Sequence, residues 1–463
     1  MNARESALLR ARSQRQAALE RLQDLLRIPS ISTFSDHKPR MLEAAGWLQQ
    51  RLEEIGLEAV EIMPTEGHPI VFGQWLHAGS EAPTVLYYGH YDVQPADPLE
   101  LWTNEPFEPV IRGDDILARG ASDMKGQVCA FLEAVEAMTQ TSGLPVNLKV
   151  MLEGEEELGS PHLAAFMARH KDLLACDVCV NGDSAILAPD LPSIVYGLRG
   201  LAYFEIRVQA AAQDLHSGGF GGVVDNPALV LARLLADMRD ESGRITLPGF
   251  YDDVRPLSVE ERAELAAVPL DDAWWLKTTG APALFGEAGY STIERAVARP
   301  TLDVCGFASG FVGEGMKTVL PARAMAKVSM RLVADQTAER VEESLRAYLQ
   351  ERAPDTVTWE LERLGSARPV IVERDSAPVA AAMRALQYVW GRKPVLTRLG
   401  YTVPVVSMVQ EMLGVDSLML GFGLTDDRQH APDEKFHLPN FYRGIETYIH
   451  FVYELVADAS DEA

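Results

Sequence analysis

The chain has 463 residues, 47% of them hydrophobic, and it carries 42 Lys and Arg against 67 Asp and Glu for a net charge of −25. A single hydrophobic core stops growing at about 250–300 residues, so this length predicts more than one domain. The acidic balance, with no stripe of Lys and Arg that could follow phosphates, excludes nucleic acid and anionic membrane surfaces as expected partners.

The first 26 residues are rich in Arg, Glu and Gln and predict one amphipathic helix. They contain no apolar stretch of about 7–15 residues, which a signal peptide would need. No run of about 20 apolar residues, the length of a transmembrane helix, occurs in the sequence. We therefore expect a soluble protein of the cytoplasm.

The next part of the chain predicts alternating helices and strands. Apolar residues recur at helical spacing over 40–55, alternate as in strands over 57–62 and 70–75, and form an apolar strand at 84–88. A helix after Gly126 and a strand at 146–152 continue the pattern. Strands separated by helices favour an α/β fold with a mostly parallel central sheet flanked by helices.

The pattern changes near residue 200. A strand at 201–209, a glycine-rich loop at 216–222, a helix from residue 226, a polar stretch at 243–300, a strand at 324–333 and a helix at 336–353 predict an inserted α+β unit. The glycine-rich loop lacks the Gly-Lys-Ser/Thr of a phosphate-binding P-loop. A helix at 378–390 and a last apolar helix ending near residue 456 follow, ahead of an acidic tail that we expect to be disordered. The predicted domains are 1–198 with 373–463, and the inserted 199–372.

Four cysteines are too few for a disulfide framework. Cys176 and Cys179 form a C-x-x-C pattern, which could be a redox pair or half of a zinc knuckle. No second C-x-x-C completes a knuckle, and the segment resembles the start of a strand. We therefore interpret both as small core residues.

Histidines and carboxylates that could bind metal follow one another along the chain. They are His90, Asp92, Asp123, Glu156, Glu157, Asp183 and His430. All but the last fall where a predicted strand runs into a loop, which is where open α/β sheets hold ligands. Imidazole and carboxylate ligands without thiolates suit Zn²⁺, Mn²⁺ or Co²⁺ in a hydrolytic role. The series predicts a pair of divalent ions that hold a water molecule between them.

Position in the sequence indicates individual roles. Asp123 is the natural bridge between two ions because it lies between the other ligands and begins a helix. Asp92 is too close to His90 to bind metal independently, and it is better placed to accept the second N–H of that imidazole. One of the adjacent Glu156 and Glu157 can bind metal while the other takes a proton from the water and passes it to a leaving amine. Taken singly, the glutamates could instead be an exposed acidic run, and each histidine an ordinary core or loop residue.

These motifs together resemble a family of dinuclear zinc peptidases that includes carnosinase-like dipeptidases, carboxypeptidase G, aminoacylase and succinyl-diaminopimelate desuccinylase. The resemblance extends from Pro29-Ser30-Ile31-Ser32 to His430. It implies two ions, zinc first with manganese or cobalt as alternatives. One would be held by His90, Asp123 and Asp183. The other would be held by Asp123, Glu157 and His430, with Glu156 as general base and acid.

The resemblance also implies that the inserted unit is a lid and dimerisation domain. His216, in Asp214-Leu215-His216-Ser217-Gly218, would act in trans on the oxyanion of a partner subunit's site. Arg331 would grip a substrate carboxylate, for which a guanidinium is chemically suited. The alternatives are an ordinary loop histidine and an exposed strand arginine. Thr402 lies in Leu399–Pro404, where relatives commonly have Glu-Gly-Gly-Ser-Ile-Pro, and we expect it to contact the substrate.

The sequence thus predicts a homodimeric metallopeptidase that hydrolyses short peptides, above all dipeptides with a free C-terminal carboxylate. The nearest alternative is a deacylase of N-acyl amino acids with the same di-metal centre. A binding protein that keeps the fold without turnover is disfavoured because Glu156 and every expected ligand are present. A redox role for Cys176 and Cys179 is the most distant alternative.

Overall fold

The computed structural model describes residues 2–461, and the chain divides into two compact units. The first unit comprises Met1–Tyr196, Val372–Thr397 and Pro404–Ala463, and the second comprises Gly197–Ile371 and Arg398–Val403. The short segment Arg398–Val403, which contains Thr402, therefore belongs to the second unit although it follows that unit's main segment by more than twenty residues in the sequence.

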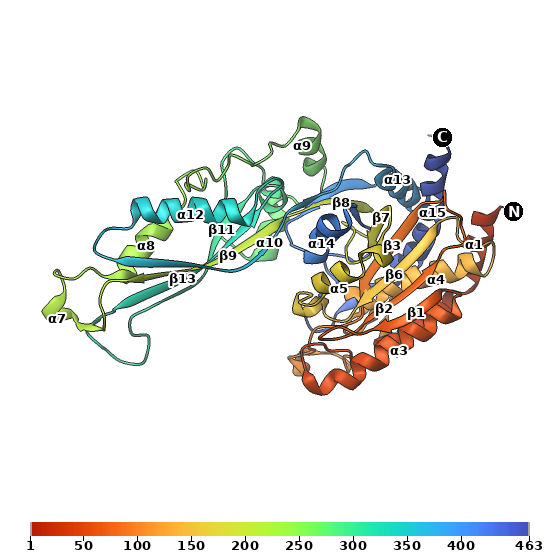
Figure 1. The fold of residues 1–463 in the computed structure, drawn as a ribbon, viewed down its shortest axis with the longest axis horizontal. Helices are drawn as coiled ribbons and strands as arrows, with labels where there is room; N and C mark the ends of the chain where they lie inside the picture. The colour runs from red at the N-terminus through yellow and green to blue at the C-terminus, as the bar shows by residue number, and fades with distance from the viewer. Residues whose placement is uncertain (1, 462–463) are drawn as a thin grey trace. The chain divides into compact units, whose positions relative to one another are not determined.

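A central sheet organises the first unit (Figure 1). Its strand order is β1 (Glu58–Met63), β2 (Ile70–Trp75), β6 (Asn147–Glu153), β3 (Thr84–His90), β7 (Val178–Asn181), β17 (Ser417–Met419) and β8 (Ser193–Leu198). Strands β6, β3, β7 and β17 are parallel to one another, and β2 and β8 pair with this parallel core in the antiparallel sense. The predicted α/β fold with a mostly parallel central sheet is confirmed.

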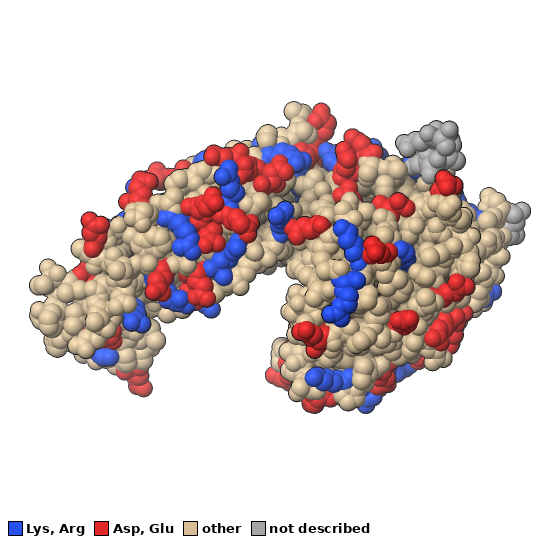
Figure 2. Space-filling model, in the orientation of Figure 1, with Lys and Arg blue, Asp and Glu red and all other residues tan. Residues whose placement is uncertain are grey.

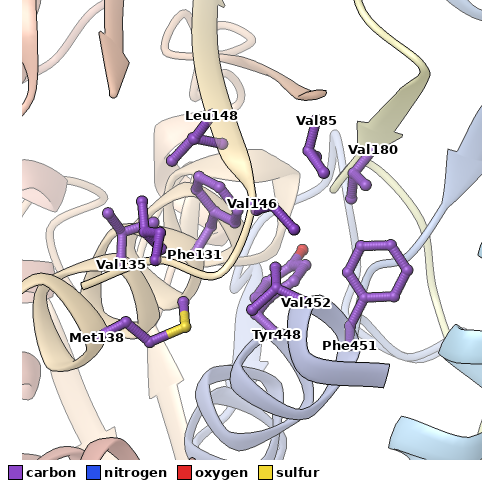
Figure 3. Close-up of a pocket in the computed structure, with 11 residues that line it drawn as sticks. Val85, Phe131, Val135, Met138, Val146, Leu148, Val180, Tyr448, Phe451 and Val452 are labelled. Atoms are coloured by element: carbon purple, nitrogen blue, oxygen red, sulfur yellow. The ribbon is translucent and has the colours of Figure 1, made fainter. Parts of the chain in front are cut away.

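Helices α3 (Lys38–Glu54), α4 (Gly126–Thr139), α13 (Ala377–Trp390) and α15 (Leu438–Asp461) flank this sheet. Figure 3 shows apolar side chains of α4 and α15 meeting those of the strands around Val85 and Val180. Phe131 of α4 lies edge-on to Tyr448 of α15, with ring centroids 5.2 Å apart. Burial of such apolar surface, at about 25 cal/mol per Å², holds the helices on the sheet. The tail expected to be disordered begins within α15, and residues 462–463 lie outside the described part.

The N-terminal segment contains two helices where the sequence pattern predicts one. Helix α1 (Ala3–Ser13) and helix α2 (Arg15–Leu26) meet at Gln14, whose φ of −101° and ψ of 10° are not helical. Arg12 of α1 pairs with Glu446 of α15 at 2.7 Å, whereas Arg21 of α2 pairs with Glu133 of α4. Arg15 at the start of α2 also pairs with Glu446 of α15, at 3.1 Å, so the two helices share one partner across the break.

A smaller three-stranded sheet in the first unit connects distant parts of the chain. Its order is β18 (Lys435–His437), β5 (Asp115–Leu117) and β4 (Val110–Arg112). Strand β18 pairs antiparallel with β5, so that Phe436 lies opposite Ile116. This pairing sets the segment after His430 beside the segment that leads to Asp123.

The second unit contains a four-stranded antiparallel sheet with helices on one face (Figure 1). The strand order is β11 (Thr301–Ser309), β13 (Arg323–Leu332), β9 (Gly200–Gln209) and β14 (Thr358–Ala367), and the main helices are α8 (Pro227–Asp237) and α12 (Ala338–Arg352). Alternate residues of β13 are buried, as the period of two predicts for a sheet with one covered face. They pack with Phe204, Ile206 and Leu345 in one apolar cluster.

The polar stretch 243–300, for which the sequence pattern predicts no helix or strand, contains three short helices. They are α9 (Val259–Ala266), α10 (Asp272–Thr279) and α11 (Thr292–Val297). Ser258 and Ser291 each begin a helix with a capping box, in which the serine side chain and a glutamate three residues later satisfy each other's backbone N–H groups. Apolar periodicity misses such short helices.

Figure 2 shows acidic and basic side chains interspersed over the visible surface of the second unit. On α12 and β14 several of them form pairs, such as Arg346 with Glu342 at 2.7 Å and Arg363 with Glu339 at 2.5 Å. Exposed pairs of this kind contribute only about 0–1 kcal/mol each to stability. Among the described helices, none has the length and apolar character needed to span a membrane.

Candidate active site

Three strands of the first unit end at a cluster of acidic and imidazole side chains. His90 is the last residue of β3, Glu156 and Glu157 lie in a short 3-10 turn just after β6, and Asp183 lies two residues beyond β7. Because β6, β3 and β7 are parallel, their carboxyl ends meet at one edge of the sheet. Asp123 reaches the same edge from the turn that precedes α4.

Two groups of potential metal ligands share one residue. His90, Asp123 and Asp183 form one group and Asp123, Glu157 and His430 the other, and in each group the ligand atoms lie within 4.8 Å of one another. Asp123 Oδ1 lies 3.1 Å from His90 Nε2, whereas Asp123 Oδ2 lies 2.9 Å from His430 Nε2. One carboxylate oxygen therefore faces each group. The structure brings together all five residues predicted as ligands, and their role as ligands stays a prediction.

The cluster contains more acidic than basic groups. Burial and then the charge of Asp123 raise the pKa of Asp183 to about 7. Burial also raises the pKa of Glu156 well above its usual value, opposed by the charge of His90 and helped by Asp183 and Glu157. Carboxylates that crowd one another in this way are stabilised by a bound cation. Oxygen and imidazole ligands without thiolates fit a divalent metal ion.

The two histidines act as partial counter-ions for Asp123. Burial alone would raise the pKa of Asp123, but hydrogen bonds with His430 and His90 hold it below its usual value. The hydrogen bond with Asp123 is the largest cause that raises the pKa of His430 to about 10, and the hydrogen bond with Glu157 is the next. His430 Nε2 lies 3.2 Å from Glu157 Oε2. The imidazole nitrogens are thus already oriented toward the oxygens with which they would share a metal.

Asp92 supports both His90 and the glutamate turn. Its carboxylate Oδ1 lies 3.3 Å from His90 Nδ1, and it accepts the backbone N–H groups of Glu156 and Glu157 at 3.2 and 3.1 Å. The hydroxyl of Ser32 donates to it at 2.7 Å. A carboxylate behind a metal-binding imidazole fixes the orientation of its ring. The hydrogen bond of His90 Nδ1 is with the backbone carbonyl of Asp92 at 3.0 Å, and the role of the Asp92 carboxylate as its acceptor stays a prediction.

A second buried polar set lies behind Asp123, and sequence reasoning did not find it. It consists of Arg119, Ser122, Asp427 and Glu434. Each of these residues is within four positions of a predicted ligand. The signal available in the sequence was the position of two charged residues, Arg119 four residues before Asp123 and Glu434 four residues after His430.

Three predicted site residues belong to the second unit. His216 lies in β10 (Leu215–His216), is exposed, and accepts the N–H of Gly218 at Nδ1 over 3.0 Å. Arg331 Nη1 donates to Thr402 Oγ1 at 2.8 Å, and Thr402 in turn donates to the carbonyl of Arg199 at 2.7 Å. The structure therefore joins Arg331 and Thr402 in one hydrogen-bonded group. Their contact with a substrate stays a prediction.

Arg199 is a further residue of this group that the sequence did not indicate. Its Nε donates to the carbonyl of Gly400 at 3.0 Å, which ties the Leu399–Pro404 segment in place. Burial and then the charge of Arg331 lower the pKa of Arg199 to about 10. Within residues 2–461, neither guanidinium forms an ion pair with a carboxylate. Two adjacent cations of this kind favour an anionic ligand.

Cys176 and Cys179 offer little reactivity. Cys179 is buried and Cys176 is half-buried, and both thiols are free. Burial raises the pKa of the Cys176 thiol to about 12. Because the thiolate is the reactive form, such a thiol exchanges slowly. The position of Cys179 in β7 agrees with the interpretation of a core residue.

Comparison with known proteins identifies the family. The family model for peptidase family M20/M25/M40 matches residues 86–454. The chain belongs to this family. The family prediction and the prediction of a peptide-bond hydrolase are thereby confirmed, and membership implies that the protein binds a divalent metal.

Relatives agree with this assignment over most of the chain. Human Beta-Ala-His dipeptidase is 32% identical over 378 residues, which cover 80% of this chain and 75% of the relative. The Cys-Gly metallodipeptidase DUG1 of Candida albicans is 31% identical over 466 residues, covering 94% of each chain. The M20 family metallo-carboxypeptidase Sso-CP2 of Sulfolobus solfataricus is 32% identical, with a TM-score of 0.82 over 95% of this chain and 99% of that one.

Proposed function

We propose that this member of the family is a cytoplasmic dipeptidase that hydrolyses dipeptides with a free C-terminal carboxylate, using two divalent ions. Zinc is the first choice of metal, and manganese and cobalt are the alternatives. The observation that carries the proposal is the position of Asp123, whose two oxygens face two separate ligand groups. The names of the dipeptidase relatives support the substrate class.

The candidate ligands divide between two ions. His90 and Asp183 would hold one, Glu157 and His430 would hold the other, and Asp123 would bind both. Bound divalent ions supply Lewis-acid chemistry, because they polarise a peptide carbonyl and make a water molecule acidic near neutral pH. Asp92 would keep His90 in the orientation that points Nε2 at the metal.

Glu156 is the proposed proton carrier. Asp92 fixes the backbone of this residue by accepting its N–H at 3.2 Å, and the raised pKa of Glu156 suits a group that must both accept and release a proton. Its carboxylate would take a proton from the attacking water and deliver it to the nitrogen of the leaving amine. Glu157 differs because its carboxylate already contacts His430 and accepts a hydrogen bond from Gln94 at 2.8 Å.

Arg331 and Thr402 are the proposed contacts for the substrate's terminal carboxylate. The hydroxyl of Thr402 fixes Arg331 Nη1, so the remaining donors of that guanidinium have a defined direction. The neighbouring charge of Arg199 adds to the preference for an anion. A carboxylate binds a guanidinium through two parallel hydrogen bonds, which gives both affinity and orientation.

A substrate panel tests this proposal. Metal-free protein is reloaded with Zn²⁺, Mn²⁺ or Co²⁺ and offered dipeptides, the C-terminal amides of the same dipeptides, and N-acyl amino acids. We expect turnover of the dipeptides and a large loss with the amides, which lack the carboxylate. Faster turnover of the N-acyl amino acids would favour the deacylase alternative, and equal turnover of acids and amides would remove the carboxylate contact.

We further infer that the second unit forms a homodimer. Strand β11 is at one edge of its sheet, and apolar side chains remain exposed on it and on the loop that follows, including Val304, Phe307 and Phe311. Val312 and Met316 are 93% and 100% exposed. Exposed edges and apolar patches of this kind are typical of protein interfaces. Family resemblance then assigns His216 to the partner subunit's active site.

Complementation tests the role of His216. We expect His216→Ala to be folded, metal-loaded and nearly inactive. Mixing it with His430→Ala should restore part of the activity, because a mixed dimer has one site with an intact metal centre in one chain and an intact His216 in the other. Mixed dimers are first verified by mass spectrometry. Verified mixed dimers without recovered activity would exclude the trans role.

A further inference from the structure

A buried glutamate joins the two halves of the candidate metal centre. Glu434 has no exposed surface and lies four residues after His430, at the entrance to β18. The pairing of β18 with β5 places it beside the segment from Ala118 to Asp123, and its carbonyl accepts the N–H of Ala118 at 3.0 Å. Its side chain therefore lies directly behind the backbone that presents Asp123.

Each oxygen of this carboxylate accepts two hydrogen bonds. Oε1 accepts the backbone N–H groups of Ser122 and Asp123 at 3.0 and 3.1 Å. Oε2 accepts the N–H of Gly120 at 2.9 Å and Nη1 of Arg119 at 2.7 Å. Hydrogen bonds to an ionised acceptor are about twice as strong as neutral ones. The Gly120–Asp123 backbone is thus held by an internal anion.

Arg119 connects Glu434 to the loop after β3. It is 1% exposed, and its Nη2 donates to the carbonyl of Pro95 at 3.2 Å. Pro95 belongs to the loop that follows His90 and carries Asp92. The pair of Arg119 and Glu434 therefore connects the loop after β3, the segment of Asp123 and the segment of His430.

The loop that carries His430 needs such support. Arg428, His430 and Asp433 have φ values of 58°, 59° and 60°, a left-handed backbone that residues other than glycine adopt at a cost. Asp427 holds the start of this loop by accepting the hydroxyl of Ser122 at 2.7 Å. Glu434 holds its end. The loop is thus anchored on both sides to the Gly120–Asp123 segment.

We propose that Glu434 is a positioning residue that keeps the bridging Asp123 in register with His430 before any metal binds. Without it, four buried donors, one of them the charged Arg119, would lose their acceptor, and Asp123 and His430 could move apart. An arrangement fixed in advance lowers the cost of binding an ion. The inference rests on the metal site of the proposed function and not on its substrate.

The test compares Glu434→Gln with Glu133→Gln. Glu133 is a matched control because it is also a buried carboxylate of the first unit paired with arginines, Arg21 and Arg51, but lies ten residues from Asp123 in the sequence. Metal-free wild type and both variants are titrated with Zn²⁺ against a competing chelator. We expect about 10–100-fold weaker zinc binding for Glu434→Gln, the range typical of supporting residues around a metal, and wild-type affinity for Glu133→Gln.

Amide hydrogen exchange in the metal-free proteins gives a second reading that does not involve metal. Exchange at Ser122 and Asp123 should be faster in Glu434→Gln than in Glu133→Gln once the two are compared at equal global stability. Equal zinc affinity in wild type and Glu434→Gln, or equal weakening in both variants, would overturn the proposal.

If Glu434→Gln does not fold, Arg119→Lys provides the same test, with a smaller loss of affinity expected because the charge is kept. Wild-type affinity in a folded Arg119→Lys would then overturn the proposal. Failure of the wild type itself to bind two ions would instead contradict the proposed function.

Discussion

Two buried acidic clusters of the first unit differ in how their charge is balanced. On α4, Glu133 and Glu136 face Arg21 of α2 and Arg51 of α3, with Arg51 3.0 Å from Glu133 and 2.5 Å from Glu136. At the sheet edge, His90 and His430 lie among the carboxylates of Asp92, Asp123, Glu156, Glu157 and Asp183. The guanidiniums of Arg21 and Arg51 are permanent cations, whereas imidazoles are cationic only when protonated.

The pKa values follow this difference. Burial would raise the pKa of Glu136, but Arg51 and Arg21 hold it below its usual value. In the sheet-edge cluster the pKa of Asp183 rises to about 7. The carboxylates on α4 are already neutralised by arginines. The carboxylates at the sheet edge carry negative charge that an added cation would neutralise. The comparison separates a structural ion-pair cluster from a site that binds cations.

The largest effect should come from the residue that both metal groups share. Asp123→Ala should lose both ions and all measurable hydrolysis, because its carboxylate contacts both histidines. Elemental analysis of the purified variant measures the ions. Glu133→Gln, with the balanced cluster altered instead, should keep both. Retention of one ion by Asp123→Ala would show that its carboxylate does not bridge.

Substitutions of the adjacent Glu156 and Glu157 should distinguish metal binding from catalysis. Glu156→Gln should keep both ions and lower kcat by about 10²–10⁴-fold, the usual contribution of a general acid–base group. Glu157→Gln should instead weaken one ion, because Glu157 contacts His430. Parallel metal analysis and steady-state kinetics distinguish the two. If Glu157→Gln keeps both ions while Glu156→Gln keeps its turnover, the two roles are reversed.

Arg199 and Arg331 of the second unit form no ion pair within residues 2–461. They test whether positively charged side chains without a carboxylate partner also mark a ligand site. Arg331→Met should lower kcat/KM for dipeptides by roughly 10–150-fold, as expected for the loss of a charged hydrogen bond worth about 1.5–3 kcal/mol. Dipeptide amides should be affected little, since they lack the carboxylate. An equal loss with acids and amides would assign Arg331 a structural role.

The smallest effect concerns His450, whose ring lies near two arginines, Arg4 and Arg12, and two glutamates, Glu446 and Glu454. Burial and then the charge of Arg4 lower the pKa of His450 from 6.5 to about 4, and its ring stacks on Tyr388. The unfolded chain therefore binds the proton more readily, so the stability that neutral His450 provides is present above pH 6.5 and lost as the pH falls toward 4.

His450→Phe should keep the stacking and reduce this pH dependence. The change in slope is at most about 1.4 kcal/mol per pH unit, and less here because the ring is half-buried and solvent screens it. Urea unfolding of metal-free wild type and variant between pH 4 and 7 measures it. Identical slopes would show that His450 does not titrate differently in the two states.

The grouping of the candidate ligands was predictable because each lies at the end of a strand or within a short local motif. His90, Glu157 and Asp183 follow β3, β6 and β7, and parallel strands bring such positions to one edge. The sheet itself was predictable from apolar alternation. The roles of the residues that surround the candidate ligands depend on long-range contacts, which no local sequence pattern predicts.

Glu434 and Gln14 illustrate what the sequence could not provide. Glu434 bonds to Arg119 across 315 positions, and only the pairing of β18 with β5 brings them together. The helix break at Gln14, whose φ and ψ are not helical, leaves no signal in the apolar periodicity of the segment. In α9 the capping box of Ser258 and Glu261 was visible in the sequence, but the helix is too short to show an apolar period.

The most direct test of the central claim is the number of divalent ions that wild-type protein binds. Metal-free protein is titrated with Zn²⁺ by calorimetry, and the saturated protein is analysed for its metal content. We expect two ions per chain, both absent from Asp123→Ala and both present in Glu133→Gln. Saturation at a single ion would contradict the claim that the unbalanced carboxylates around Asp123 form a dinuclear site.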